Sequence, residues 1–103
     1  MNITALESST GKASTLLKSL GNEQRLLILV NLQKGEKSVG ELEPILKLSQ
    51  SALSQHLARL RRDKLVQTRR VSQTIYYSIS CDAAIFILGA LCQVYCSSVQ
   101  PPS

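Results

Sequence analysis

The sequence has few of the side chains that hold metal ions or build disulfide frameworks. Its only histidine is His56, and its three cysteines, Cys81, Cys92 and Cys96, are an odd number gathered in one region. Small secreted domains that depend on disulfides usually contain an even number of cysteines at regular spacings. The sequence therefore does not fit a disulfide-stapled secreted domain, and we expect a protein of a reducing cytoplasm.

Long apolar runs are missing as well. The most apolar stretch, residues 83–92, is shorter than the roughly 20 residues that a helix needs to cross a bilayer. The first residues are polar and contain no apolar segment of the kind found in signal peptides. We therefore expect a cytoplasmic location and no membrane partner.

Motifs for catalysis and cofactor binding are not visible either. The sequence has no glycine-rich loop that would cradle phosphates, no evident pair of carboxylates and no evident nucleophile with a neighbouring base. We expect the protein not to be an enzyme and to hold no cofactor.

Acidic residues become scarce after residue 43. From residue 44 onward, seven basic residues face only Asp63 and Asp82, and this excess accounts for the whole net charge of +5. Six of the seven basic residues lie within residues 59–70. A cluster of this kind favours a polyanionic partner such as nucleic acid.

Length and apolar content are sufficient for one domain with a modest core. We expect residues 1–12, which are mostly polar, to be a flexible segment. The domain should span residues 13–97, followed by a disordered tail at residues 98–103.

The first two helices are expected at residues 13–20 and 23–33. Gly21 should end the first helix, and Asn22 should cap the second. The string LLILVNL in the second helix is apolar nearly all round, which predicts a place in the middle of the core. In the first helix we expect three buried leucines: Leu16, Leu17 and Leu20.

Residues 38–63 predict two short helices joined by a tight turn. Ser38 and Glu41 have the spacing of a capping box, and Ser49 is a suitable N-cap for the second helix. The first of these helices should turn Leu42, Ile45 and Leu46 inward. In the second, one apolar stripe should pack inward, consisting of Leu53, Leu57 and Leu60. The remaining faces are polar, as in helix-turn-helix proteins that place their second helix in the major groove of DNA.

The periodicity then changes to that of strands. Residues 65–70 and 74–79 are rich in β-branched and aromatic side chains and predict an antiparallel hairpin, separated by residues 71–73. A basic hairpin directly after a DNA-reading helix is a wing that can reach phosphates or the minor groove. A plain solvent-facing hairpin is the alternative. We expect the inward side chains to be Ile75, Tyr77 and Ile79.

The last helix, residues 82–96, has no charged residue after Asp82, and apolar side chains cover most of its circumference. A terminal helix of a small domain cannot bury every face against its own core, and the exposed patch would be unusually large for a monomer. We therefore expect a homodimer joined through these helices, although a helix tucked into its own domain is the alternative. The expected dimer contacts are Ile85, Leu88, Leu91, Cys92 and Tyr95.

Several strings resemble the ArsR/SmtB family of winged-helix repressors. They are QRLLIL at 24–29, SVGELE at 38–43, LSQSALSQHLARLRRDKLV at 48–66, TRR at 68–70 and QTIYYSI at 73–79. The ILGAL stretch at 87–91 is similar to that of the family's nodulation repressors. The resemblance implies a mainly α, winged helix-turn-helix fold of order α-α-α-α-β-β-α. It also implies a homodimer that binds a palindromic, AT-rich operator in double-stranded DNA and represses transcription.

The candidate DNA contacts follow from this resemblance and from the residue types. The resemblance assigns base and phosphate contacts to Gln50, Ser51, Ser54 and Gln55, and wing contacts to Arg70 and Gln73. A glutamine can bridge the N6 and N7 atoms of adenine, whereas arginines after the helix would clamp phosphates without reading sequence. The complete candidate set is Ser49, Gln50, Ser51, Ser54, Gln55, Arg59, Arg62, Arg69, Arg70, Gln73 and Thr74.

Effector sites of the family are not evident in this sequence. One family metal site needs a Cys-x-Cys pair where this chain has Ser38 to Glu41, and another needs histidines on the final helix. We expect no metal site and no evident small-molecule effector.

A second class of the family senses reactive sulfur through two cysteines, and the resemblance places Val30 where the first would stand. The alternatives are therefore a thiol switch that pairs Cys96 with Cys92 or Cys81, and reduced cysteines that act as small apolar side chains. From a different class, the domain would be a protein-interaction module whose basic face meets an acidic partner.

Overall fold

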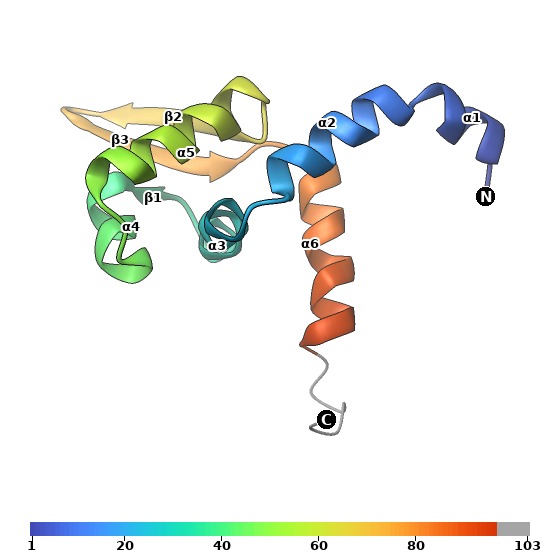
Figure 1. The fold of residues 1–103 in the computed structure, drawn as a ribbon. Coiled ribbons are helices and arrows are strands. Elements are labelled where there is room, and N and C mark those ends of the chain that lie inside the picture. Colours follow the sequence, from blue (N-terminus) through green and yellow to red (C-terminus); the bar gives the residue numbers. More distant parts are fainter. Residues whose placement is uncertain (97–103) are drawn as a thin grey trace.

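The computed structural model describes residues 1–96 and shows a mainly helical chain with one small antiparallel sheet (Figure 1). The elements along the chain are α1 (Ile3–Ser8), α2 (Thr10–Leu20), α3 (Glu23–Leu32), β1 (Lys37–Ser38), α4 (Val39–Leu46), α5 (Gln50–Arg62), β2 (Val66–Val71), β3 (Thr74–Ile79) and α6 (Asp82–Tyr95). The expected order of helices and hairpin is confirmed, with α1 and β1 as additions.

Residues 1–12 contain more regular structure than the sequence suggested. They form α1 and the first turn of α2, which starts at Thr10 instead of residue 13. Every side chain of residues 1–10 is exposed, so α1 is not tied down by the core. The flexibility of this segment stays a prediction. The expected domain end at residue 97 and the tail at 98–103 lie outside the described residues.

Local capping signals define most helix starts. Asn22 caps α3 by accepting hydrogen bonds from the backbone N–H groups of Gln24 and Arg25. Ser38 and Glu41 form the expected capping box at α4, and Ser49 caps α5 by accepting from the N–H of Ala52 at 3.1 Å. These caps satisfy N–H groups that have no partner within their helix.

The sheet has three strands in the order β1-β3-β2. β2 and β3 form the expected hairpin, but Val71 belongs to β2 and pairs with Thr74, so the turn contains only Ser72 and Gln73. Ser72 takes the positive φ of 55° that tight hairpin turns require, although it is not glycine. β1 was not expected. It consists of two residues whose strand character depends on pairing with β3.

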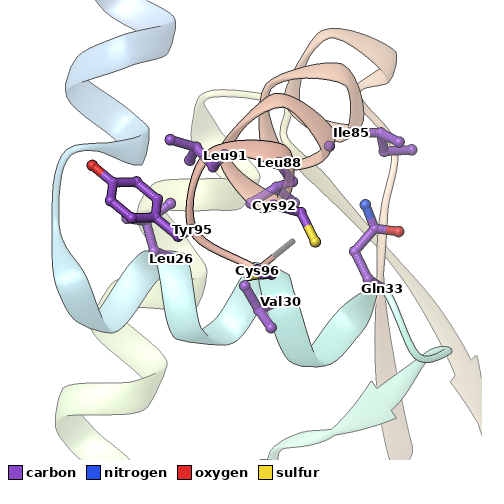
Figure 2. A pocket seen from close by; sticks show the side chains of 10 residues that line it. Leu26, Val30, Gln33, Ile85, Leu88, Leu91, Cys92, Tyr95 and Cys96 are labelled. Atoms are coloured by element: carbon purple, nitrogen blue, oxygen red, sulfur yellow. The ribbon is translucent and has the colours of Figure 1, made fainter. Parts of the chain in front are cut away.

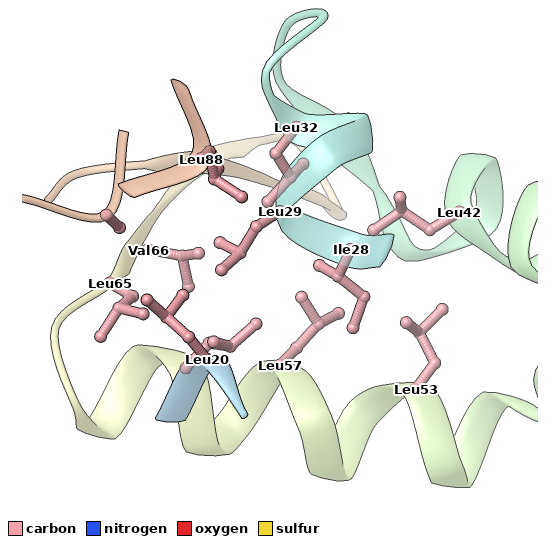
Figure 3. Packing of buried hydrophobic residues seen from close by; sticks show 12 residues of the cluster. Leu20, Ile28, Leu29, Leu32, Leu42, Leu53, Leu57, Leu65, Val66 and Leu88 are labelled. Carbon is pink, nitrogen blue, oxygen red and sulfur yellow. The ribbon is translucent and has the colours of Figure 1, made fainter. Parts of the chain in front are cut away.

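The core lies where α2, α3, α4 and α5 meet the hairpin and the start of α6 (Figure 3). The stripe Leu53, Leu57 and Leu60 of α5 is fully buried there, as the spacing predicted. Ile28 and Leu29 of α3 face this stripe and are also fully buried. The core therefore fixes how α5 is rotated and which of its faces points outward.

Several side chains expected inside are exposed. Leu17 is 57% exposed, Ile45 is 49% exposed and Ile75 is 37% exposed. On α3, Leu27 and Val30 are exposed as well, so this helix is not surrounded on all sides. These positions lie beyond the edge of the small core, and the expectation that α3 is buried on nearly all sides was wrong.

Candidate nucleic-acid interface

The α4–α5 unit is a helix-turn-helix. Lys47 ends α4 in the left-handed conformation, with φ 56° and ψ 38°, which turns the chain sharply toward α5. Because Leu53, Leu57 and Leu60 are buried, α5 exposes the opposite face over its first turns. That outward face carries four exposed side chains: Gln50, Ser51, Ser54 and Gln55.

These four side chains have the chemistry that base edges require. They are neutral hydrogen-bonding groups near the start of a helix, and the family resemblance assigned them to DNA contact. Ser49 is exposed too, but its hydroxyl oxygen already accepts the capping hydrogen bond from Ala52. The structure brings the helix part of the candidate set together on one outward surface, while contact with DNA stays a prediction.

Two of the arginines at the end of α5 contact the same carboxylate. Arg59 and Arg62 approach Asp63 through their Nε atoms at 3.4 and 3.3 Å, and the Asp63 side chain is only 14% exposed. Burial alone would raise the pKa of Asp63, but the neighbouring Ser19 hydroxyl and these two arginines outweigh it and hold the pKa below its ordinary value. Arg59 and Arg62 are therefore partly neutralised before any phosphate approaches.

The two wing arginines point to opposite faces of the hairpin. Arg70 lies opposite Ile75 in the register. Tyr77 and Ile79 lie on the same face of the hairpin as Ile75 and pack against the core. Arg69 lies opposite Tyr76, on the outer face. Gln73 and Thr74 are exposed at the tip, as expected. The wing and α4 lie at one end of the molecule, and α1 lies at the other (Figure 1).

Arg69 is engaged within the chain. Its Nε atom donates to the Oε2 atom of Glu36 at 3.1 Å, and its Nη2 atom donates to Oε1 of the same carboxylate. Its guanidinium also lies 5.3 Å from the ring centroid of Tyr76, within the range of a cation–π contact. Among residues 1–96, no hydrogen bond or ion pair holds the guanidinium of Arg70.

The α6 face expected at a dimer interface is largely apolar and open. Tyr95 is 77% exposed, Ile85 and Cys92 are exposed and Leu91 is half-buried, whereas Phe86, which is 80% exposed, lies on the opposite side of the helix. Leu88 differs from these, because it is 8% exposed and belongs to the chain's own core. A charge at Leu88 would therefore disturb the fold itself, and Tyr95, which is exposed on the same face, is the better probe.

A groove of about 750 Å³ runs between α3 and α6 (Figure 2). Its walls are mainly apolar, and they include Leu26, Val30, Leu91 and Tyr95. Val30 is the position at which the resemblance expects a cysteine, and it lies across this groove from Cys92 and Cys96.

The three cysteines are free thiols. The hydrogen bond and the charge of Cys92 raise the pKa of Cys96, which lowers its thiolate fraction near neutral pH. In the part of the chain that the structure describes, no cluster of three or more His, Cys, Asp or Glu side chains is placed to hold a metal ion. Within the same residues, no helix has both the length and the apolarity to cross a membrane.

Sequence reasoning missed the contacts that Glu36 and Asp63 make. Asp63 follows a run of arginines, so its position was a usable signal. Glu36 meets Arg69 across 33 residues of sequence, and no local pattern links them.

Known proteins similar to this chain are bacterial regulators. Residues 22–68 match the family described as bacterial regulatory protein, arsR family. The transcriptional activator HlyU of Vibrio cholerae is 49% identical over 100 residues, covering 97% of this chain and 93% of HlyU. Nodulation protein NolR of Rhizobium meliloti is 55% identical over 83 residues, covering 81% of this chain and 68% of NolR. The crystal structure of the transcriptional repressor BigR from Xylella fastidiosa has a TM-score of 0.89 and 35% identity, covering 95% of this chain and 100% of that chain.

Proposed function

Given that this chain belongs to the arsR family of bacterial regulatory proteins, we propose that it represses transcription as a homodimer bound to a palindromic, AT-rich operator. The observation that carries the proposal is the outward face of α5, where Gln50, Ser51, Ser54 and Gln55 are exposed together. The proposal places the protein in the cytoplasm of a bacterium and gives it no catalytic role.

The proposed readout follows from the chemistry of this face. A glutamine side chain can donate a hydrogen bond to the N7 atom of adenine and accept one from the N6 amino group of the same base. It can therefore distinguish A·T from G·C pairs in the major groove. Gln50 and Gln55 would read bases, and the serines can serve as donors or acceptors to bases or phosphates. Arginines after α5 would contact phosphates, which positions the protein without reading sequence.

The proposed dimer follows from the composition of α6. Its exposed Ile85, Cys92 and Tyr95 lie on one side of the helix together with the half-buried Leu91, and they would leave an apolar surface in contact with water in a monomer. Pairing two copies about a two-fold axis would cover this surface. It would also present two α5 helices to half-sites one helical turn apart, which adds affinity and lengthens the recognised sequence.

A binding assay tests the proposal against the interaction-module alternative. Full-length protein is titrated against a labelled AT-rich palindromic duplex and against a random-sequence duplex of the same length. The proposal expects tighter binding to the palindrome and a steep fall in affinity with salt. Equally weak binding to both duplexes would refute sequence-specific repression and favour a protein-interaction module.

A second candidate is repression controlled by thiols. It is favoured by the positions of Cys92 and Cys96, which line the same groove next to α3. Affinity for the palindromic duplex is measured in reductant and after treatment with polysulfide or peroxide. A loss of affinity that disappears in a Cys92→Ala, Cys96→Ala double variant would support the switch, and unchanged affinity in the wild type would exclude it.

A further inference from the structure

The outer face of the sheet carries an ion pair between Glu36, which directly precedes β1, and Arg69 of β2, and the pair spans Tyr76 of β3. Tyr76 of β3 lies opposite Arg69 of β2 on one side and opposite Ser38 of β1 on the other. Glu36, two residues before Ser38, therefore extends toward the same face. Its carboxylate accepts both hydrogen bonds from Arg69, and the guanidinium crosses the Tyr76 ring to reach it. The fork of the guanidinium is thus filled by a carboxylate in the way that a phosphate would fill it.

We propose that Glu36 withholds Arg69 from DNA phosphates and so limits how much the wing adds to binding. The proposal rests on the DNA-binding function above and names Glu36 as a residue that sets affinity without touching a base. Arg70 is then the wing arginine available to DNA, because it lies on the same side of the sheet as α5 and no carboxylate holds it among residues 1–96.

The exposure of the pair argues against a mainly structural role. The side chains of Arg69 and Glu36 are 58% and 37% exposed, and ion pairs open to water and salt contribute little to folding. The hydrogen bond from Arg69 lowers the pKa of Glu36, so the carboxylate stays charged at neutral pH. The negative charge of Glu36 beside the wing opposes the approach of a polyanion. It also neutralises the positive charge of Arg69, one of the two wing arginines.

Counterion release gives the size of the expected effect. Each phosphate contact contributes a slope of about 0.9 to the dependence of log affinity on log salt. If Glu36→Gln frees Arg69 for one phosphate, the ratio of variant to wild-type affinity should change about eightfold over a tenfold range of salt. The gain should be similar for palindromic and random duplexes, because phosphates carry no sequence information.

The experiment measures binding of full-length Glu36→Gln and wild-type protein to the two duplexes between about 0.05 and 0.5 M salt. Glu7→Gln on α1 is the matched control, since it makes the same charge change at the other end of the molecule (Figure 1). Arg69→Gln and Arg70→Gln are measured in the wild-type and Glu36→Gln backgrounds. We expect Glu36→Gln alone to tighten binding and steepen the slope by about 0.9. Arg69→Gln should abolish that gain but should weaken the wild type less than Arg70→Gln does.

Two results would overturn the inference. Unchanged or weaker binding by Glu36→Gln would mean that the carboxylate does not compete with phosphate and instead supports the wing. Equal losses from Arg69→Gln and Arg70→Gln in the wild type would mean that both arginines already contact DNA. Either result leaves the proposed function intact if wild-type protein still prefers the palindrome. If wild-type protein shows no preference for the palindrome, the proposed function itself is refuted.

Discussion

The Nε atom of Arg25 donates a hydrogen bond to the carbonyl oxygen of Ser19 at 2.6 Å, and this bond ties the first turn of α3 to the last turn of α2. The Nη2 atom of Arg25 reaches the carbonyl of Lys18 at 3.1 Å. The last carbonyls of a helix have no partner within it, and a buried cation satisfies them while complementing the helix dipole. Burial, followed by the charge of Arg59, lowers the pKa of Arg25, as expected for a cation removed from water.

Replacing Arg25 should therefore destabilise the fold. Arg25→Met keeps much of the apolar stem but removes both hydrogen bonds, and we expect a loss of about 1.5–3 kcal/mol, as for hydrogen bonds to charged groups. Urea unfolding at a fixed protein concentration measures it, because dimerisation would make stability depend on concentration. The exposed Arg61→Met is the control and should stay within about 0.5 kcal/mol of wild type. Similar losses in the two variants would contradict the assigned role of Arg25.

The sequence predicted those features of the fold that depend on local chemistry. The capping box of Ser38 and Glu41, the caps at Asn22 and Ser49, and the buried stripe of α5 each arise from residues within one or two turns of each other. β1 could not be predicted in this way, because two residues become a strand only when β3 lies beside them.

The outward face of α5 was predictable because burying one stripe of a helix determines which residues remain outside. Leu17 and Ile75 were assigned inward because periodicity shows a face but not where the core ends. The pair between Glu36 and Arg69 depends on the register of three strands, and no pattern in the sequence specifies that register. The exposure of the candidate residues on α5 was thus predictable, whereas the contacts made by the wing were not.

Gln50→Ala should relax sequence preference. If Gln50 makes a bidentate contact to adenine, its loss should cost about 1–3 kcal/mol on the preferred palindrome and much less on a random duplex. Fluorescence anisotropy with both duplexes measures the difference. Gln93→Ala on α6 is the matched control and should change neither affinity. An equal loss on both duplexes would show that Gln50 contacts the backbone and not a base.

Arg70→Ala should weaken binding to every duplex by a similar factor. A phosphate contact carries no sequence information, so its loss should affect all duplexes alike. If Arg70 makes one such contact, the steepness of the dependence of log affinity on log salt should fall by about 0.9. A salt titration on palindromic and random duplexes measures both quantities. A selective loss on the palindrome would assign Arg70 to base reading, contrary to this account.

Tyr95→Glu should split the proposed dimer. The Tyr95 side chain is 77% exposed and lies outside the chain's own core, so a charge there should disturb association without unfolding the domain. Sedimentation should shift from twice the chain mass toward 11.3 kDa. Gln67→Glu on the exposed face of β2 adds the same charge elsewhere and should leave the mass of the dimer unchanged. A Tyr95→Glu variant that keeps the dimer mass would exclude this part of α6 from the interface.

The thiol of Cys96 should react slowly at neutral pH. Hydrogen bonding and charge interaction with Cys92 raise the pKa of Cys96, and the thiolate is the reactive form. Alkylation should therefore accelerate as the pH rises toward and above the ordinary range for a cysteine. Cys92→Ala should lower the pKa of Cys96 and speed its alkylation near neutral pH, whereas Cys81→Ala should not. Mass spectrometry of alkylated peptides follows each site, and an unchanged rate in Cys92→Ala would contradict the coupling.

The most direct test of the central claim is selection of bound fragments from a random-sequence duplex pool by full-length protein. If two copies place their α5 helices in the major groove, the recovered sequences should contain two AT-rich half-sites. These should be related by two-fold symmetry, with centres about one helical turn, roughly 10 base pairs, apart. Recovery of no enriched sequence, or of a single half-site without a symmetric partner, would contradict the account.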